Sequence, residues 1–106
     1  MTEDLRVDVS AEADDTCVVT VVGELEPSTA PQLERELQAS AFTSNCTRLV
    51  IDLTGVTFMD SSGLGVVLNA HKKMRARDGR LVVRQPSRTV QRLLEITALT
   101  NQLVIE

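Results

Sequence analysis

The residues of this sequence best suited to chemistry are three consecutive short polar side chains, Asp60, Ser61 and Ser62. They stand between an apolar run at 48–53, which predicts a buried strand, and an apolar stripe at 64–71 with helical spacing. A helix therefore begins at this polar run. Because a helix N-terminus carries partial positive charge and open N–H donors, a serine there can cap the helix, act as a nucleophile or receive a phosphate.

A serine nucleophile needs a general base within hydrogen-bonding reach, and the chain contains a single histidine. His71 follows Ser61 by ten residues, which is about 15 Å along a helix and too far for a hydrogen bond. Met59 also occupies the position where the nucleophile elbow of serine hydrolases requires glycine. We therefore expect that the protein is not an enzyme and that His71 borders the core.

Other motifs for bound groups are also missing from the sequence. The run Gly63-Leu64-Gly65 is too short for a phosphate-binding loop, and no lysine follows it at the required place. Cys17 and Cys46 have neither CxxC spacing nor a histidine companion, so they indicate no metal or redox site. Cys17 stands inside an apolar run and is predicted to be a small core residue.

The length of 106 residues predicts one domain that spans 1–106. The chain is 42% hydrophobic but has two Phe and neither Tyr nor Trp, so aliphatic side chains must build the core. The shortage of aromatic rings also disfavours recognition of nucleic-acid bases by stacking. The net charge of −4 argues against a surface that binds a phosphate backbone. We therefore expect no direct nucleic-acid partner.

The charge is unevenly spread along the chain. Residues 1–70 carry 3 basic and 12 acidic side chains, whereas residues 71–106 carry 8 basic and 3 acidic ones. The basic cluster is either a nucleic-acid patch or the solvated side of two helices and a strand, and the acidic total favours the solvated surface. The sequence has no signal peptide and no long apolar span, which predicts a cytoplasmic protein without a membrane partner.

The first half of the chain predicts two strands and a helix. Apolar and polar residues alternate over 5–10, the period of a half-buried strand, and an acidic turn separates this run from 17–22, which is apolar on both faces. These two runs predict a hairpin, with the second strand ending at Gly23. After a loop, Thr29 and Gln32 have the spacing of a capping box. The helix that follows has an apolar stripe: Ala30, Leu33, Leu37 and Ala41.

The second half of the chain alternates strands and helices. The central helix runs from Ser62 to about Arg77 and stops at Asp78-Gly79, since glycine is common just past a helix end. A strand at 81–83, a helix capped by Ser87 and a strand at 103–105 complete the order β-β-α-β-α-β-α-β. This order predicts an α/β fold, with a mostly parallel four- to five-stranded sheet and helices packed on it.

From Gly23 to Leu99 the chain resembles the anti-sigma factor antagonists, which are single STAS domains. The most specific match is Phe58–Gly65, which is close to a signature of these bacterial regulators. Three further matches occur in corresponding order: Gly23–Glu26, Leu49–Leu53 and Leu93–Thr97. The chain departs from the family pattern at Glu26, where aspartate is typical, at Ala98, where glycine is common, and after Glu106, where relatives usually add a C-terminal helix.

The resemblance implies that Ser61, the serine after the aspartate, is phosphorylated by the partner, an anti-sigma factor with ATP-dependent serine kinase activity. The unphosphorylated protein would bind this partner and release the sigma factor, phosphate on Ser61 would switch binding off, and a serine phosphatase would restore it. ATP is then used by the kinase, and the protein has no cofactor of its own. The implied partner-binding residues are Glu24, Glu26, Thr29, Asp60, Ser61, Ser62 and Gly63. The alternative is a STAS scaffold or sensor module that binds an anion or a nucleotide without a sigma factor pathway.

Overall fold

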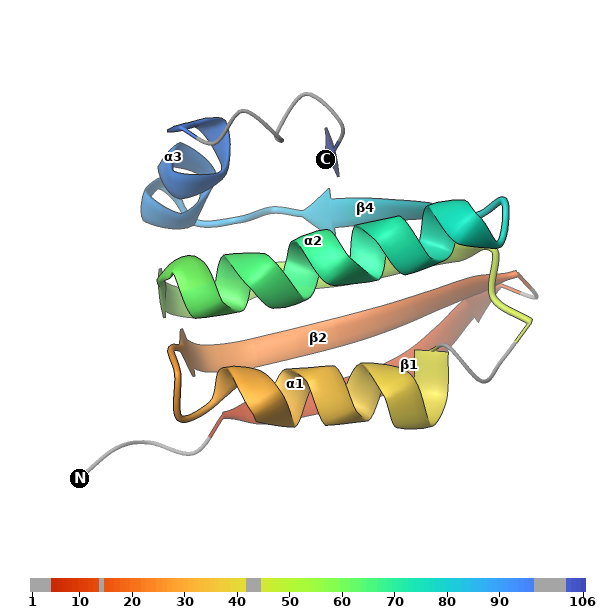
Figure 1. Cartoon of the computed structure of the whole chain (residues 1–106), viewed down its shortest axis with the longest axis horizontal. Coiled ribbons are helices and arrows are strands. Elements are labelled where there is room, and N and C mark those ends of the chain that lie inside the picture. Colours follow the sequence, from red (N-terminus) through yellow and green to blue (C-terminus); the bar gives the residue numbers. More distant parts are fainter. Residues whose placement is uncertain (1–4, 14, 42–44, 97–102) are drawn as a thin grey trace.

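The computed structural model describes residues 5–13, 15–41, 45–96 and 103–106, and Figure 1 shows how its elements are arranged. The strands are β1 (Arg6–Ala13), β2 (Thr16–Leu25), β3 (Arg48–Met59), β4 (Arg80–Arg84) and β5 (Val104–Ile105). The helices are α1 (Ala30–Glu36), which continues into the π-helical turn η1 (Leu37–Ala41), then α2 (Ser61–Ala76) and α3 (Arg88–Ile96). The predicted order of strands and helices is confirmed.

The five strands form one sheet in the order β1-β2-β3-β4-β5. β1 is antiparallel to β2 and every other neighbouring pair is parallel, which confirms the predicted mostly parallel sheet. α1 and α2 lie side by side across one face of this sheet (Figure 1). Because β2 and β3 run in the same direction, both end where α1 and α2 begin. We call this region the carboxyl end of the sheet.

β2 and β3 are longer than the sequence pattern predicts. The sequence predicts their ends at Gly23 and Leu53, whereas pairing between them continues to Leu25 and Met59. Two register shifts interrupt this pairing, one of them next to Gly23, whose φ of 126° is a conformation that side chains rarely allow. The extra residue of each shift lies in β3 and breaks the alternation of its side chains, whereas β2 extends to Leu25 because Glu24 and Leu25 pair with Phe58 and Met59. β1 likewise runs to Ala13, into the predicted acidic turn.

The main core lies between the sheet and the helices and is aliphatic, as the composition predicts. Its largest fully buried side chains come from strands and helices alike: Leu25, Leu33, Leu37, Leu49, Ile51, Leu53, Met74, Leu81 and Leu94. Cys17 is partly buried and packs against this core, at its border rather than inside it. In the described ranges, no helix is long and apolar enough to cross a membrane.

The face of the sheet opposite α1 and α2, which we call the open face, carries a smaller apolar cluster. Its members are three buried valines, one each from β2, β3 and β4: Val18, Val50 and Val82. Because side chains alternate between the faces of a strand, Arg48 and Arg84 lie on the same face as these valines. Arg48 pairs with Glu106 at 2.7 Å and with Glu12 at 3.6 Å, and Arg84 pairs with Glu12 at 3.3 Å and with Glu106 at 3.2 Å. This ion network lies beside the valines, and the arginine stems can cover their apolar surface.

α2 packs tightly against β2 and β3 at Gly63. A Cβ atom at this position would lie 2.7 Å from the Leu25 Cβ and 2.9 Å from the Met59 Cγ, which is closer than ordinary contacts allow. Gly65 lies on the exposed side of the same helix, and a Cβ there would meet no atom within 4 Å. The lack of a side chain is therefore a packing requirement at Gly63 and not at Gly65.

We expect Gly63→Ala and Gly65→Ala to change stability in opposite directions. Alanine at 63 must displace Leu25 and Met59, which should lower the free energy of unfolding by about 1–3 kcal/mol. Alanine at 65 improves helix propensity in open space and should raise that free energy by about 0.5–1 kcal/mol. Urea unfolding of both variants measures the two effects, and a stabilising Gly63→Ala would contradict the close packing.

His71 is buried on the core side of α2, with 7% of its surface exposed, which confirms its predicted place at the core. Neither ring nitrogen has a hydrogen-bond partner in the part of the chain that the structure describes. Burial, and secondly the charge of Arg75, lower the pKa of this imidazole below its usual 6.5. The folded protein therefore holds this ring in the neutral form at neutral pH.

The lowered pKa of His71 predicts a loss of stability in mild acid. Between the folded pKa and about 6.5 the unfolded chain binds a proton that the folded chain does not, so the free energy of unfolding should fall as the pH decreases through this range. His71→Leu removes the titrating group and should flatten the dependence. Urea unfolding at several pH values between about 5 and 8 tests this. If the wild-type and His71→Leu curves ran parallel, buried His71 would not be responsible.

Candidate functional site

The turn from β3 into α2 contains the polar run Asp60-Ser61-Ser62. Asp60 is the N-cap of α2: its backbone is extended, and its Oδ1 accepts a hydrogen bond of 2.8 Å from the Ser62 N–H. The helix therefore begins at Ser61, at the predicted place within one residue. The Asp60 N–H also donates to the Leu25 carbonyl at 3.1 Å, so the turn is fastened to the end of β2.

The two serines of this turn have different environments. Ser62 is half-buried, and its hydroxyl donates to the same Asp60 Oδ1 that accepts its N–H. This bond confirms the predicted structural role of Ser62 in the first turn of the helix. Ser61 is exposed, and its hydroxyl makes no hydrogen bond within the described residues. Of the two hydroxyls, only that of Ser61 is free to react without breaking the cap.

Asp60 is a fixed negative charge beside Ser61. The hydrogen bond from the Ser62 hydroxyl, and further bonds from the Ser62 and Gly63 N–H groups, lower the pKa of the Asp60 carboxyl below 3.8. The carboxylate thus already occupies donors that a helix N-terminus offers to an anion. A phosphate on Ser61 would lie close to the Asp60 carboxylate. The combined negative charge would act more strongly on a protein bound at this turn than the phosphate charge alone.

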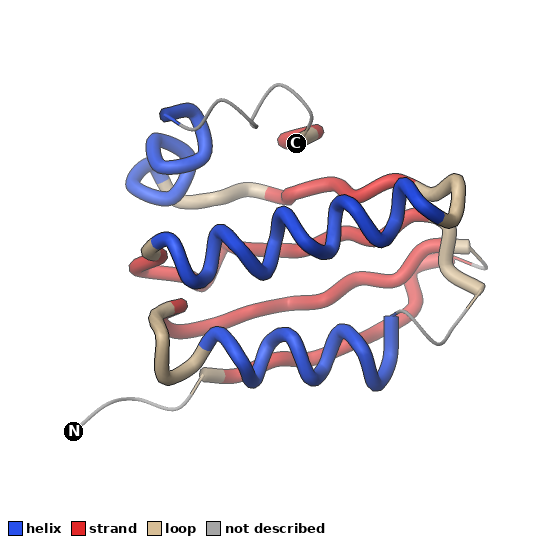
Figure 2. The backbone as a smooth tube through the Cα atoms, viewed as in Figure 1, coloured by secondary structure: helices blue, strands red, loops and turns tan. Residues whose placement is uncertain are grey.

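The loop between β2 and α1 lies next to this turn, because Leu25 pairs with Met59 and Glu24 with Phe58. Figure 2 shows the loop and the start of α2 at the same end of the molecule. Glu24 is exposed and Glu26 and Thr29 are partly exposed. The fold therefore brings the predicted partner-binding residues of the loop close to Asp60 and the two serines.

The predicted capping box at Thr29 and Gln32 is wrong. Thr29 occupies the N-cap position, but its side chain makes no cap bond; its Oγ1 donates to the Glu24 carbonyl at 2.6 Å and accepts from the Glu26 N–H at 3.0 Å. Gln32 instead donates to the Leu5 carbonyl at 2.9 Å. The Thr29 hydroxyl bonds to the loop and not to the helix, because the chain folds back on itself between β2 and α1. These bonds hold the backbone of Glu24 and Glu26 in place.

Gly63 is the predicted site residue that the fold buries. It lies beneath Leu25 and Met59, so its part in the site is to let α2 pack against the strand ends. A direct contact between Gly63 and a partner stays a prediction. His71 belongs to the same continuous helix as Ser61 and faces the core, so its ring cannot reach the serine hydroxyl as a base.

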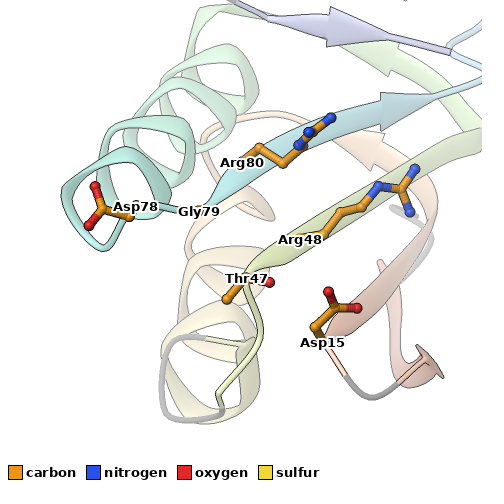
Figure 3. Close-up of a pocket in the computed structure, with 6 residues that line it drawn as sticks. All are labelled: Asp15, Thr47, Arg48, Asp78, Gly79 and Arg80. Carbon is orange, nitrogen blue, oxygen red and sulfur yellow. The ribbon is translucent and has the colours of Figure 1, made fainter.

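A polar pocket lies at the opposite end of the sheet. Its lining residues come from the starts of β3 and β4 and from neighbouring turns: Asp15, Thr47, Arg48, Asp78, Gly79 and Arg80. Figure 3 shows Arg48 and Arg80 extending in the same direction from adjacent strands. Arg48, however, is already paired with two glutamates, and two aspartates balance the charge of the lining. This pocket therefore does not favour an anion or a nucleotide.

Comparison with known proteins assigns the chain to a family. The STAS domain model matches residues 9–105. An anti-sigma-B factor antagonist of Listeria monocytogenes is 34% identical over 102 residues, covering 96% of this chain and 89% of that protein. The crystal structure of an anti-sigma factor antagonist from Mycobacterium paratuberculosis has a TM-score of 0.86 at 26% identity, with 99% of this chain and 89% of that chain covered.

A further solved structure has the same fold. The anti-sigma factor antagonist SpoIIAA in its unphosphorylated form has a TM-score of 0.80 at 25% identity, and the match covers 95% of this chain and 88% of that chain. The family model, the relative and the structures agree with the family resemblance of the sequence. The chain belongs to the STAS-domain family of anti-sigma factor antagonists.

Proposed function

We propose that this protein binds an anti-sigma factor through the surface around Ser61, and that phosphorylation of Ser61 by that partner ends the binding. The observation that carries this proposal is the difference between the two serines. The Ser62 hydroxyl is held by Asp60, whereas the Ser61 hydroxyl is exposed at the first position of α2. A kinase can therefore reach Ser61 without unfolding the turn.

The names of the relatives support the identity of the partner. The Listeria monocytogenes relative is an antagonist of an anti-sigma factor, and the match spans nearly all of both chains. An antagonist that binds the anti-sigma factor displaces the sigma factor held there. By this proposal the partner also carries the serine kinase activity and uses ATP, and a serine phosphatase returns the protein to its binding form.

The charges around Ser61 explain how one phosphate could switch the interaction. Phosphate adds nearly two negative charges and three acceptor oxygens at this position. They would stand beside the Asp60 carboxylate, whose pKa is lowered, and near Glu24 at the end of β2 and Glu26 in the loop after it. A partner surface that fits a neutral hydroxyl would then face concentrated negative charge and lose affinity. In this scheme the protein is the substrate of the kinase and performs no catalysis itself.

Ser61, rather than Ser62, is expected to accept the phosphate. The experiment incubates the full chain with each purified anti-sigma factor kinase of its source organism and ATP labelled in the γ-phosphate. Ser61→Ala should abolish labelling, while Ser62→Ala, which loses a cap bond but keeps the exposed hydroxyl, should at most reduce it. Peptide mapping by mass spectrometry locates the modified residue. Equal labelling of Ser61→Ala and the wild type would remove Ser61 from the mechanism.

Ser61→Asp tests whether charge alone switches binding. A carboxylate at the helix start should leave the free energy of unfolding within about 1 kcal/mol of the wild type, since the helix dipole and Asp60 act on it in opposite directions. Binding to the anti-sigma factor should weaken about a hundredfold, which corresponds to about 3 kcal/mol. Ser61→Asn, which has the same shape without the charge, is the matched control. A Ser61→Asp variant that bound like Ser61→Asn would exclude the charge mechanism.

A further inference from the structure

Two apolar side chains are exposed on the open face at the carboxyl end of the sheet. They are Phe58 with 44% and Val22 with 40% of their surface exposed. Met59 is buried, so alternation along β3 places Phe58 on the open face, and its register partner is Glu24. Val22 is paired with Gly55, which has no side chain to cover it; a Cβ at Gly55 would lie 2.9 Å from the Val22 Cγ2.

The other half of the open face combines buried valines with ion pairs. There the buried valines lie beside the ion network of Arg48, Arg84, Glu12 and Glu106. The four ion pairs involve Arg48, Arg84, Glu12 and Glu106, and in the described part of the chain they lie away from Phe58 and Val22. On this face the three valines of β2, β3 and β4 are buried, whereas Phe58 and Val22 are exposed at the end nearest Ser61 and Val104 is exposed on β5. An exposed aromatic ring with an apolar neighbour is typical of a protein-binding surface.

We propose that Phe58 and Val22 form an apolar anchor for the anti-sigma factor that binds around Ser61; this inference rests on the proposed function. Phe58 precedes Ser61 by three residues and is paired with Glu24 at the end of β2, so the anchor is continuous with that surface. Glu24 pairs with Phe58 and Asp60 follows it by two residues, whereas exposed Arg6 of β1 pairs with Val22. The acidic residues next to Phe58 favour a partner with an apolar pocket and a basic rim.

The acidic rim also distinguishes this partner from a second copy of the chain. Two copies joined through this surface would bring Glu24 and Asp60 of one copy close to the same acidic residues of the other, which is unfavourable.

The anchor contributes to binding of the partner, whereas Ser61 takes part in the reaction. Burial of Phe58 supplies affinity that does not involve the reacting phosphate, so it should help the kinase to hold its substrate without changing the phosphoryl transfer.

The test measures binding of full-length variants to the purified anti-sigma kinase that labels Ser61, by titration calorimetry. Phe58→Ala should weaken binding about thirtyfold, as truncation of a central aromatic contact does. Val22→Thr keeps the β-branched shape and removes only apolar character, so a smaller but clear loss is expected. Val104→Ala is the matched control, because Val104 is 49% exposed on the same face but pairs with Val82, away from Ser61.

Kinetics of Ser61 phosphorylation give a second, independent readout. Phe58→Ala should raise KM for the protein substrate and leave kcat unchanged, since the anchor binds equally in the ground and transition states. Binding and KM of both Phe58→Ala and Val22→Thr equal to those of the wild type would overturn the anchor, whereas failure of the wild type itself to bind would overturn the proposed function. A third outcome would also contradict the proposal. If the wild type self-associated in sedimentation runs, Phe58→Ala did not, and both bound the kinase equally well, the occupant of the anchor would be a second copy of the chain.

Discussion

The parallel pairing of β2 with β3 beyond their bulges is the constraint on which the site depends. It continues to Leu25 and Met59, and the Asp60 N–H then bonds the Leu25 carbonyl at 3.1 Å. The loop after β2 and the turn after β3 are short and polar, and neither could fix its position relative to the other by packing alone. The pairing joins them, so that an acidic loop and a serine turn from distant parts of the chain form one surface.

The cap of α2 separates the stability of the fold from the phosphorylation proposed at Ser61. Asp60 and Ser62 form the cap between them, and Gly63 allows the helix to pack close to the strand ends. Ser61 is the one residue of 60–63 that neither caps the helix nor is buried. Its charge can therefore change while the helix start remains intact. A regulator that must alter a binding surface without unfolding requires this separation.

The acidic and basic side chains lie in different parts of the fold. The exposed acidic side chain of Glu24 and the carboxylate of Asp60 lie at the carboxyl end of the sheet. The basic cluster of the second half falls on α2, β4 and α3 and is largely solvent-exposed, as the sequence predicts: Lys72, Arg75, Arg80, Arg88 and Arg92 are exposed. Lys73 and Arg75 lie in the last turn of α2, where the helix dipole favours cations. The end that carries Ser61 and the last turn of α2 thus differ in charge.

The sequence by itself determined the order of the elements, the aliphatic core, the start of α2 within one residue and the structural role of Ser62. These features depend on local periodicity and on capping chemistry, which operate over a few neighbouring residues. Tertiary structure alone decided the ends of β2 and β3, because register shifts interrupt β3 and because Glu24 and Leu25 extend β2 only by pairing with β3. It also decided the bonding of Thr29, since the chain folds back and offers its hydroxyl the Glu24 carbonyl instead of the helix. The exposure of Phe58 likewise followed from the register of β3, for an apolar residue at a strand end gives no sign of which face it will occupy until its neighbours are paired.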